Sequence, residues 1–285
     1  MRLTKLLGIL SISVLLMNCE GKKETDKNMK HNKSGDHPII IAHRGGAKLA
    51  PENTLASFKN AIDLGVDMIE IDVHLSKDSE IIVIHDESLD RTTNGTGEIK
   101  ALTLDEIKKY DAGSWFSEDF KDEKVPTLAE VLQTINGQCK LLIEIKGGDE
   151  RYPGLENRIV QTVKENNAIE WVVVQSFNKN SVLRIKEMYP ELITYYLLGK
   201  NFDEFYSEFS EQVRTGKSTE IKFDGIAPHH SSLDSDKVDL LHQAGYGIFT
   251  FTINKPKDMQ KAIEIGVDGI ITDSPDILKE TLKML

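Results

Sequence analysis

The sequence has few cysteines and a deficit of positive charge. Its 285 residues include only two cysteines, Cys19 and Cys139, so a disulfide-stabilised scaffold is not expected. Cys139 precedes an apolar run and is expected to be a partly buried thiol without a chemical role. Acidic residues outnumber basic ones, 46 to 35, and the formal net charge is −11. This balance argues against a general nucleic-acid binder, although local cations in a cleft can still bind a small anion.

The longest apolar run lies at the N-terminus and is too short to predict a transmembrane helix. Residues 1–18 carry two cations and then an apolar core, which is the pattern of a signal peptide. Their end resembles a bacterial lipoprotein processing site at which Cys19 becomes lipidated, although Asn18 is larger than the residue usual there. The alternative is a plain secreted protein. Residues 19–37 predict a flexible tether. We therefore expect an extracytoplasmic protein, periplasmic or at the cell surface, that is anchored to a membrane by lipid.

The remaining chain, residues 38–285, is organised around residues 39–97. An apolar run at 39–42 leads directly into His43 and Arg44, and two glycines follow. A short apolar run that ends in this way is typical of a buried strand with polar groups at its C-terminal tip.

A second strand is predicted at residues 68–75, where polar and apolar residues alternate. Glu70 and Asp72 lie on one face, about 7 Å apart along the strand. Two carboxylates this close repel each other unless a cation or a proton lies between them. His74 shares their face but lies past the expected tip, and it is left out of the ligand set. The next apolar run ends in His85.

A later strand, at residues 140–146, carries Glu144 and Lys146 on one face. A charge at the tip of a strand that is otherwise apolar seldom stands without a partner. A structural ion pair between the two side chains would satisfy this requirement. A site at which both face a ligand would satisfy it as well.

Together these motifs resemble the glycerophosphodiester phosphodiesterase family. The matching segments are HRGGAKLAPENT, EIDV, HDESLDRTTNGTG and the LLIEIK strand tip, and the resemblance runs from about residue 39 to the C-terminus. It implies that two histidines are the acid–base pair. It also implies phosphate binding by an arginine fork and a lysine, and one divalent cation, Mg²⁺ or Ca²⁺, on oxygen ligands. The acid–base pair would be His43 and His85, and the phosphate-binding residues would be Arg44 and Lys146. The ligands of the cation would be Glu70, Asp72 and Glu144.

Strand and helix signals alternate along the chain, which implies a parallel sheet. Eight strand–helix units are counted if the run at 81–84 belongs to an extra hairpin. Eight units predict an α/β fold, a (β/α)8 TIM barrel with its active site at the C-terminal ends of the strands, where all these polar tips fall. Residues 86–125 are expected to be an insertion after the second strand, with a helix at 104–110.

Four weaker candidates could line the mouth of this barrel. Gln175 and Phe177 stand at the tip of one predicted strand. Phe251 stands where the family usually has tryptophan, so the aromatic packing would be kept without the hydrogen bond that an indole N–H can donate. Trp115 lies with Phe116 in the insertion. This pair could line the mouth or fill a small core of the insertion, and we favour the second.

The resemblance implies hydrolysis of a glycerophosphodiester to glycerol 3-phosphate and an alcohol such as choline, ethanolamine or glycerol. One alternative is a phospholipase-type phosphodiesterase that acts on lysophospholipids, which would need an apolar groove at the mouth. Another is a surface-binding lipoprotein without catalysis, although every matched catalytic position carries a competent side chain. The sequence leaves open which histidine is the acid, whether a cyclic phosphate forms, and the oligomeric state.

Overall fold

The computed structural model describes residues 37–216 and 223–285. The predicted signal peptide, Cys19 and nearly all of the tether lie outside the described residues. Within the described ranges, no helix combines the length and the apolar character needed to cross a membrane. Cys139 is partly buried, as predicted, and burial raises the pKa of its thiol to about 11. It is therefore not a reactive thiolate at neutral pH.

Eight parallel strands form a closed barrel, which confirms the predicted fold. Each pairs with its neighbours in the order β1-β2-β4-β5-β6-β7-β8-β9, and β9 returns to β1 through the register Ala42↔Thr272. The strands are β1 (Ile39–Ala42), β2 (Met68–Leu75), β4 (Lys140–Ile145), β5 (Val172–Ser176), β6 (Ile193–Leu198), β7 (Gly225–Pro228), β8 (Gly247–Thr250) and β9 (Gly269–Thr272).

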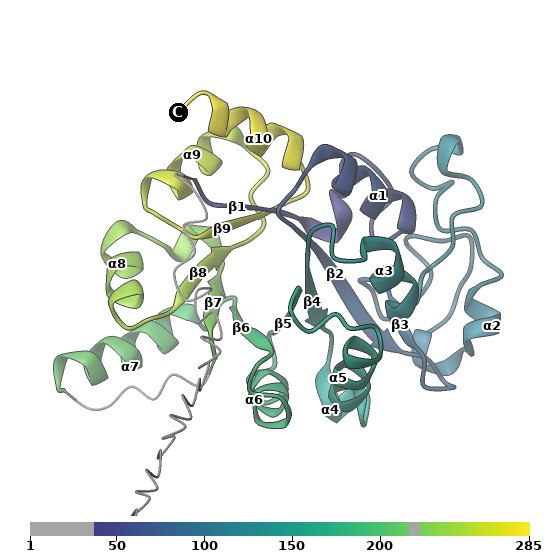
Figure 1. The fold of residues 1–285 in the computed structure, drawn as a ribbon, viewed down its shortest axis with the longest axis horizontal. Helices are drawn as coiled ribbons and strands as arrows, with labels where there is room; N and C mark the ends of the chain where they lie inside the picture. Colours follow the sequence, from purple (N-terminus) through teal and green to yellow (C-terminus); the bar gives the residue numbers. More distant parts are fainter. Residues whose placement is uncertain (1–36, 217–222) are drawn as a thin grey trace, which may run out of the picture.

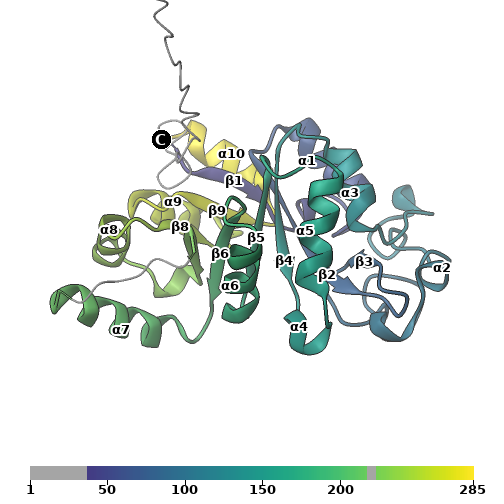
Figure 2. The ribbon, with the colours of Figure 1, turned by 60° about the horizontal axis from the view of Figure 1, so that its bottom comes forward.

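Helices surround the strands, as Figures 1 and 2 show. The longer ones follow the strands in sequence and pack apolar faces onto the outside of the barrel. They are α1 (Leu55–Leu64), α3 (Leu128–Ile135), α5 (Leu155–Glu165), α6 (Lys179–Met188), α7 (Phe202–Arg214), α8 (Ser235–Gln243), α9 (Pro256–Glu264) and α10 (Pro275–Lys283). A single turn, α4 (Gly148–Arg151), lies between β4 and α5.

Side-chain alternation along the strands separates two cores. Ile69 and Ile71 point outward into the layer between barrel and helices. Met68, with the same parity as Glu70 and Asp72, belongs to the apolar cluster inside the barrel. Because successive strand residues point to opposite faces, the two carboxylates also point into the barrel, above that apolar floor.

The run at 81–84 forms the expected extra hairpin. Its strand β3 (Ile81–Val83) pairs antiparallel with the C-terminal part of β2. The segment after it lies beside the barrel, next to β2 and β3 (Figures 1 and 2), and has an apolar cluster of its own. Its helix α2 (Leu104–Ile107) is shorter than the predicted 104–110, because the amides of Lys109 and Tyr110 bond three residues back and tighten the chain into turns.

Candidate active site

Polar residues from the first strands gather around a cavity at the C-terminal end of the barrel. The cavity has a volume of about 240 Å³. Each polar residue lies on an apolar strand that is anchored in the core, or within two residues of the end of one, so its position is fixed by the sheet. The predicted residues that line the cavity are His43, Arg44, Glu70, His85, Glu144, Lys146, Gln175, Phe177 and Phe251.

Three carboxylates form a buried acidic cluster next to the cavity. Asp72 and Glu144 are register partners on neighbouring strands, and Glu70 lies two residues before Asp72. Ligand oxygens of all three lie within 4.8 Å of one another, the one such cluster in the part of the chain that the structure describes. Glu70 Oε1 is buried and accepts no hydrogen bond from a described residue. An all-oxygen set with an unpaired buried oxygen fits a hard cation such as Mg²⁺ or Ca²⁺.

The ionisation of this cluster reflects its crowding. Burial, and then the charge of Asp72, raise the pKa of Glu70 to about 8. Burial also raises the pKa of Glu144. For Asp72, the charges of Lys146 and Arg44 outweigh the effect of burial and lower its pKa. The cluster therefore holds a proton near neutral pH unless a cation compensates the charges.

Two cations lie against the acidic cluster. Lys146 Nζ is 2.8 Å from Asp72 Oδ1 and 2.5 Å from Glu144 Oε1. Arg44 Nε lies 3.4 Å from Asp72 Oδ2, and its Nη1 donates to Glu52 Oε1 at 2.9 Å. Both cations also line the cavity. Both can therefore contact an anionic molecule that binds in the cavity beside the acidic cluster.

A tight backbone turn sets the direction of Arg44. After β1 the chain enters a short 3-10 turn, η1 (His43–Gly45), in which Arg44 has a φ of +52°. Its backbone N–H donates to Glu70 Oε2 at 2.9 Å. Gly45 has a φ of +83°, and a Cβ there would lie 2.4 Å from Ser57 Oγ. The glycine in the HRG motif is thus required for α1 to pack against this turn.

Each predicted acid–base histidine is held by a carboxylate at Nδ1. His43 Nδ1 lies 2.5 Å from Asp273 Oδ1, and His85 Nδ1 lies 2.6 Å from Asp86 Oδ1. Such a contact favours a proton on Nδ1 and leaves Nε2 to exchange protons with a ligand. His43 Nε2 is also 4.0 Å from Glu70 Oε2.

The two histidines differ in basicity. Burial alone would lower the pKa of His43, but the hydrogen bond to Asp273 and the charge of Glu70 outweigh it, and the pKa is raised above 6.5. For His85 the effect of burial exceeds the attraction of Asp72, and the pKa is lowered below 6.5. His43 is therefore the more basic of the two histidines, and His85 the less basic.

The far side of the cavity is less charged. Gln175 at the end of β5, Phe177 just after it and Phe251 after β8 contribute to its wall. Phe177 is 48% exposed, and its ring meets Phe251 edge to face at 5.7 Å between centroids. Trp115 does not line the cavity. It is 41% exposed in the insertion, packs against Phe116, and donates its indole N–H to the Ala112 carbonyl.

Comparison with known proteins agrees with this geometry. The model of the glycerophosphoryl diester phosphodiesterase family matches residues 43–277, which include every polar residue of the site described above. The chain belongs to this family. The family, the barrel and the enzyme class implied by the sequence motifs are thereby confirmed.

Named phosphodiesterases resemble the chain over nearly their whole length. A glycerophosphodiester phosphodiesterase of Caldanaerobacter subterraneus is 41% identical over 84% of this chain and 96% of its own. One of Bacillus subtilis is 32% identical over 99% of both chains. A phosphodiesterase of Oleispira antarctica, solved in complex with the product sn-glycerol-3-phosphate, superposes with a TM-score of 0.75 at 30% identity. That match covers 87% of this chain and 97% of the other.

The sequence analysis did not identify the carboxylates that contact the two predicted acid–base histidines. Asp273 follows β9, and only closure of the barrel places it beside His43. Asp86 is adjacent to His85 in the HD motif, so its contact could have been anticipated. His74, which the sequence analysis left out of the ligand set, is buried. Its Nε2 lies 3.0 Å from the His85 carbonyl and its Nδ1 lies 2.9 Å from the Tyr152 hydroxyl.

Proposed function

We propose that this enzyme hydrolyses a glycerophosphodiester to glycerol 3-phosphate and an alcohol, with one divalent cation, Mg²⁺ or Ca²⁺. The main support is the pairing of two carboxylate-held histidines with a buried acidic cluster around a single cavity. The product named in the Oleispira antarctica complex supports the same substrate class.

Glu70, Asp72 and Glu144 would hold the cation. When bound, the cation supplies positive charge that stabilises the negative charge building up on the phosphoryl oxygens. Arg44 would grip a phosphate oxygen with its planar fork, and Lys146 would add a compact charge. These contacts bind and orient the diester beside the histidines.

His85 would act as the general base and His43 as the general acid. The lowered pKa of His85 leaves Nε2 free to take a proton from the attacking hydroxyl. If this hydroxyl belongs to water, glycerol 3-phosphate forms directly; if it belongs to the glycerol moiety, a cyclic phosphate forms, and water then opens it to glycerol 3-phosphate. The raised pKa of His43 supplies a proton for the leaving alkoxide. Asp86 and Asp273 keep the two rings in place during this exchange.

A direct assay tests the reaction. The protein without residues 1–18 is incubated with glycerophosphocholine, and release of glycerol 3-phosphate is measured with EDTA and again after Mg²⁺ or Ca²⁺ is restored. Metal-dependent release is the expected result. Turnover of a lysophospholipid in place of glycerophosphocholine would favour the phospholipase-type alternative, and no release with either metal would refute the proposal.

The extracytoplasmic, lipid-anchored location is a separate proposal that depends on the leader alone. Two or more acyl chains on Cys19 would give stable membrane binding. Labelling of cells with a tagged fatty acid tests it, with Cys19→Ser as the control. Equal labelling of both proteins, or labelling of neither, would refute lipidation at this residue.

A further inference from the structure

Arg91 lies in the RTTNGTG segment, whose residues have no role in the reaction as described so far. Its guanidinium group fits between two carboxylates. Toward Asp86, Nε donates to Oδ2 at 2.7 Å and Nη2 to Oδ1 at 3.1 Å. Toward Glu52, Nη1 donates to Oε2 at 2.9 Å and Nη2 to Oε1 at 2.7 Å. Both contacts are bidentate, which fixes the plane of the fork as well as its position.

Each of these two carboxylates holds a different part of the active site. Asp86 holds His85 at Nδ1, 2.6 Å away. Glu52 accepts from Arg44 Nη1 at 2.9 Å and is almost fully buried, with 8% of its side chain exposed. One guanidinium group thereby joins the base of the reaction to the arginine that would grip the phosphate.

We propose that Arg91 is a positioning residue, which fixes the distance between His85 and Arg44 through Asp86 and Glu52. The roles of His85 and Arg44 in this inference rest on the proposed hydrolysis. Their connection through Arg91 rests on the hydrogen bonds given above. Without Arg91, Asp86 and Glu52 would be neighbouring negative charges with no cation between them, and they would move apart.

Arg44 and His85, which Arg91 connects, differ in the contacts that would remain if Arg91 were removed. Arg44 keeps a second carboxylate, Asp72, 3.4 Å from its Nε. Among the described residues, Asp86 contacts one side chain that is always cationic, Arg91, and otherwise the ring of His85. Loss of Arg91 should therefore disturb His85 more than Arg44, and kcat should fall by a larger factor than KM rises.

The size of the effect separates this role from that of an ordinary surface ion pair. Arg91 has 44% of its side chain exposed, and an exposed pair usually contributes little. Residues that orient a catalytic group typically change activity by about 10–100-fold when removed. We expect Arg91→Ala to lower kcat within that range, with a smaller rise in KM.

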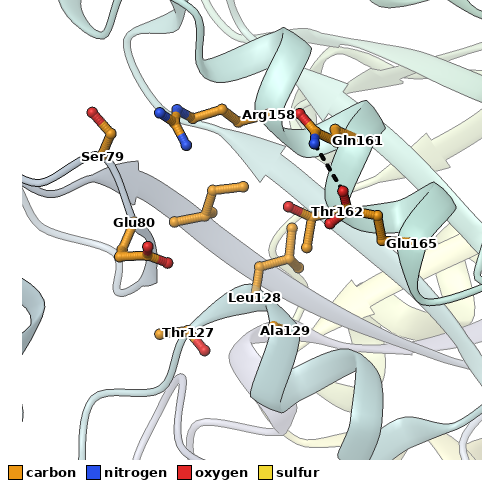
Figure 3. Close-up of a pocket in the computed structure, with 10 residues that line it drawn as sticks. Ser79, Glu80, Thr127, Leu128, Ala129, Arg158, Gln161, Thr162 and Glu165 are labelled. Atoms are coloured by element: carbon orange, nitrogen blue, oxygen red, sulfur yellow. Dashed lines mark hydrogen bonds between the residues drawn. The ribbon is translucent and has the colours of Figure 1, made fainter.

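The test compares variants in the glycerophosphodiester assay with bound metal. Arg91→Ala removes the fork, and Arg91→Lys keeps a charge but cannot make two bidentate contacts. Arg158→Ala is the matched control. Arg158 lies on α5 in a different polar cavity of about 210 Å³, shown in Figure 3, whose lining residues are all different from those of the active site. For each protein, kcat, KM and thermal unfolding are measured, with and without added millimolar guanidinium.

The expected pattern is a large loss of kcat in Arg91→Ala, partial recovery with guanidinium, an intermediate kcat in Arg91→Lys, and wild-type kinetics in Arg158→Ala. A kcat of Arg91→Ala within about twofold of wild type, or a loss that tracks the unfolded fraction and does not respond to guanidinium, would overturn the proposal. If Arg91→Ala does not fold, Arg91→Lys decides by the same twofold criterion. An inactive wild type would instead refute the hydrolysis itself.

Discussion

Replacing Glu70 by glutamine separates the effect of this carboxyl group on folding from its proposed role in cation binding. Glu70 is 1% exposed. Its Oε2 accepts the Arg44 backbone N–H at 2.9 Å, and its Oε1 lies unpaired near the oxygens of Asp72 and Glu144. A glutamine can keep the accepting oxygen and turn its N–H groups toward the two carboxylates. The variant should therefore fold with the same local geometry, but without a carboxylate charge that must be buried.

The magnitude follows from the pKa of Glu70, which is raised from 4.5 to about 8 in the folded protein. A raised carboxyl pKa means that the native state binds the proton more tightly than the unfolded state. The resulting stabilisation is complete below about pH 4.5 and is lost as the pH rises to about 8. At about 1.36 kcal/mol per pKa unit, the loss is at most about 5 kcal/mol. Glutamine does not titrate, so Glu70→Gln should exceed wild type in stability by ~2–5 kcal/mol at pH 8 and match it near pH 4.5.

The assay is urea unfolding of both proteins in EDTA at several pH values between 4.5 and 8.5, with thermal unfolding as a second measure. For a domain of this size each kcal/mol shifts the Tm by about 2–4 °C. Glu208→Gln, an exposed change on α7, is the control and should alter neither curve. Mg²⁺ or Ca²⁺ should stabilise wild type more than Glu70→Gln. A stability difference that does not change with pH, or a variant less stable than wild type at pH 8, would refute the reasoning.

Three further predictions concern the reaction. His43→Ala and His85→Ala should each lower kcat for glycerol 3-phosphate release by about 10²–10⁴-fold, and activity above a tenth of wild type would contradict the acid–base assignment. The profile of kcat/KM against pH should be bell-shaped: it falls on the acid side as His85 is protonated, below 6.5, and on the alkaline side as His43 loses its proton, above 6.5. Arg44→Lys should raise KM by about tenfold or more, because a lysine cannot replace the fork between substrate, Glu52 and Asp72; an unchanged KM would exclude Arg44 from phosphate binding.

Strand periodicity predicted part of the acidic cluster, and the family resemblance supplied the assignment of Glu144 to it. Alternation puts Glu70 and Asp72 on one face of a strand whose other face is apolar. Glu144 sits on a strand of the same kind, and parallel strands end at the same edge of a barrel. The observed register sets Asp72 directly beside Glu144. The sequence could not show that this face lies inside the barrel, above Met68, because that depends on which face the helices cover.

Apart from the contact between the adjacent residues His85 and Asp86, the contacts that orient the site could not be predicted, since they join residues far apart in the sequence. Asp273 is 230 positions from His43, and only the pairing of β9 with β1 places them together. Glu52 and Arg91 are 39 positions apart and come from segments without regular structure. Trp115 was a weak candidate for a similar reason: an aromatic residue in an insertion can face the mouth, a small core or solvent.

The charge of the site implies an order of binding. The site has six carboxyl groups, one of which holds a proton near neutral pH when no divalent cation is bound, and three side chains that are always cationic. Its net charge is therefore negative and would repel a phosphodiester. A divalent cation and a protonated His43 would bring this balance close to zero, and the monoanionic diester could then approach Arg44 and Lys146 without opposition. The cation should therefore bind before the substrate. The carboxylates are Glu52, Glu70, Asp72, Asp86, Glu144 and Asp273, and the cationic side chains are Arg44, Arg91 and Lys146.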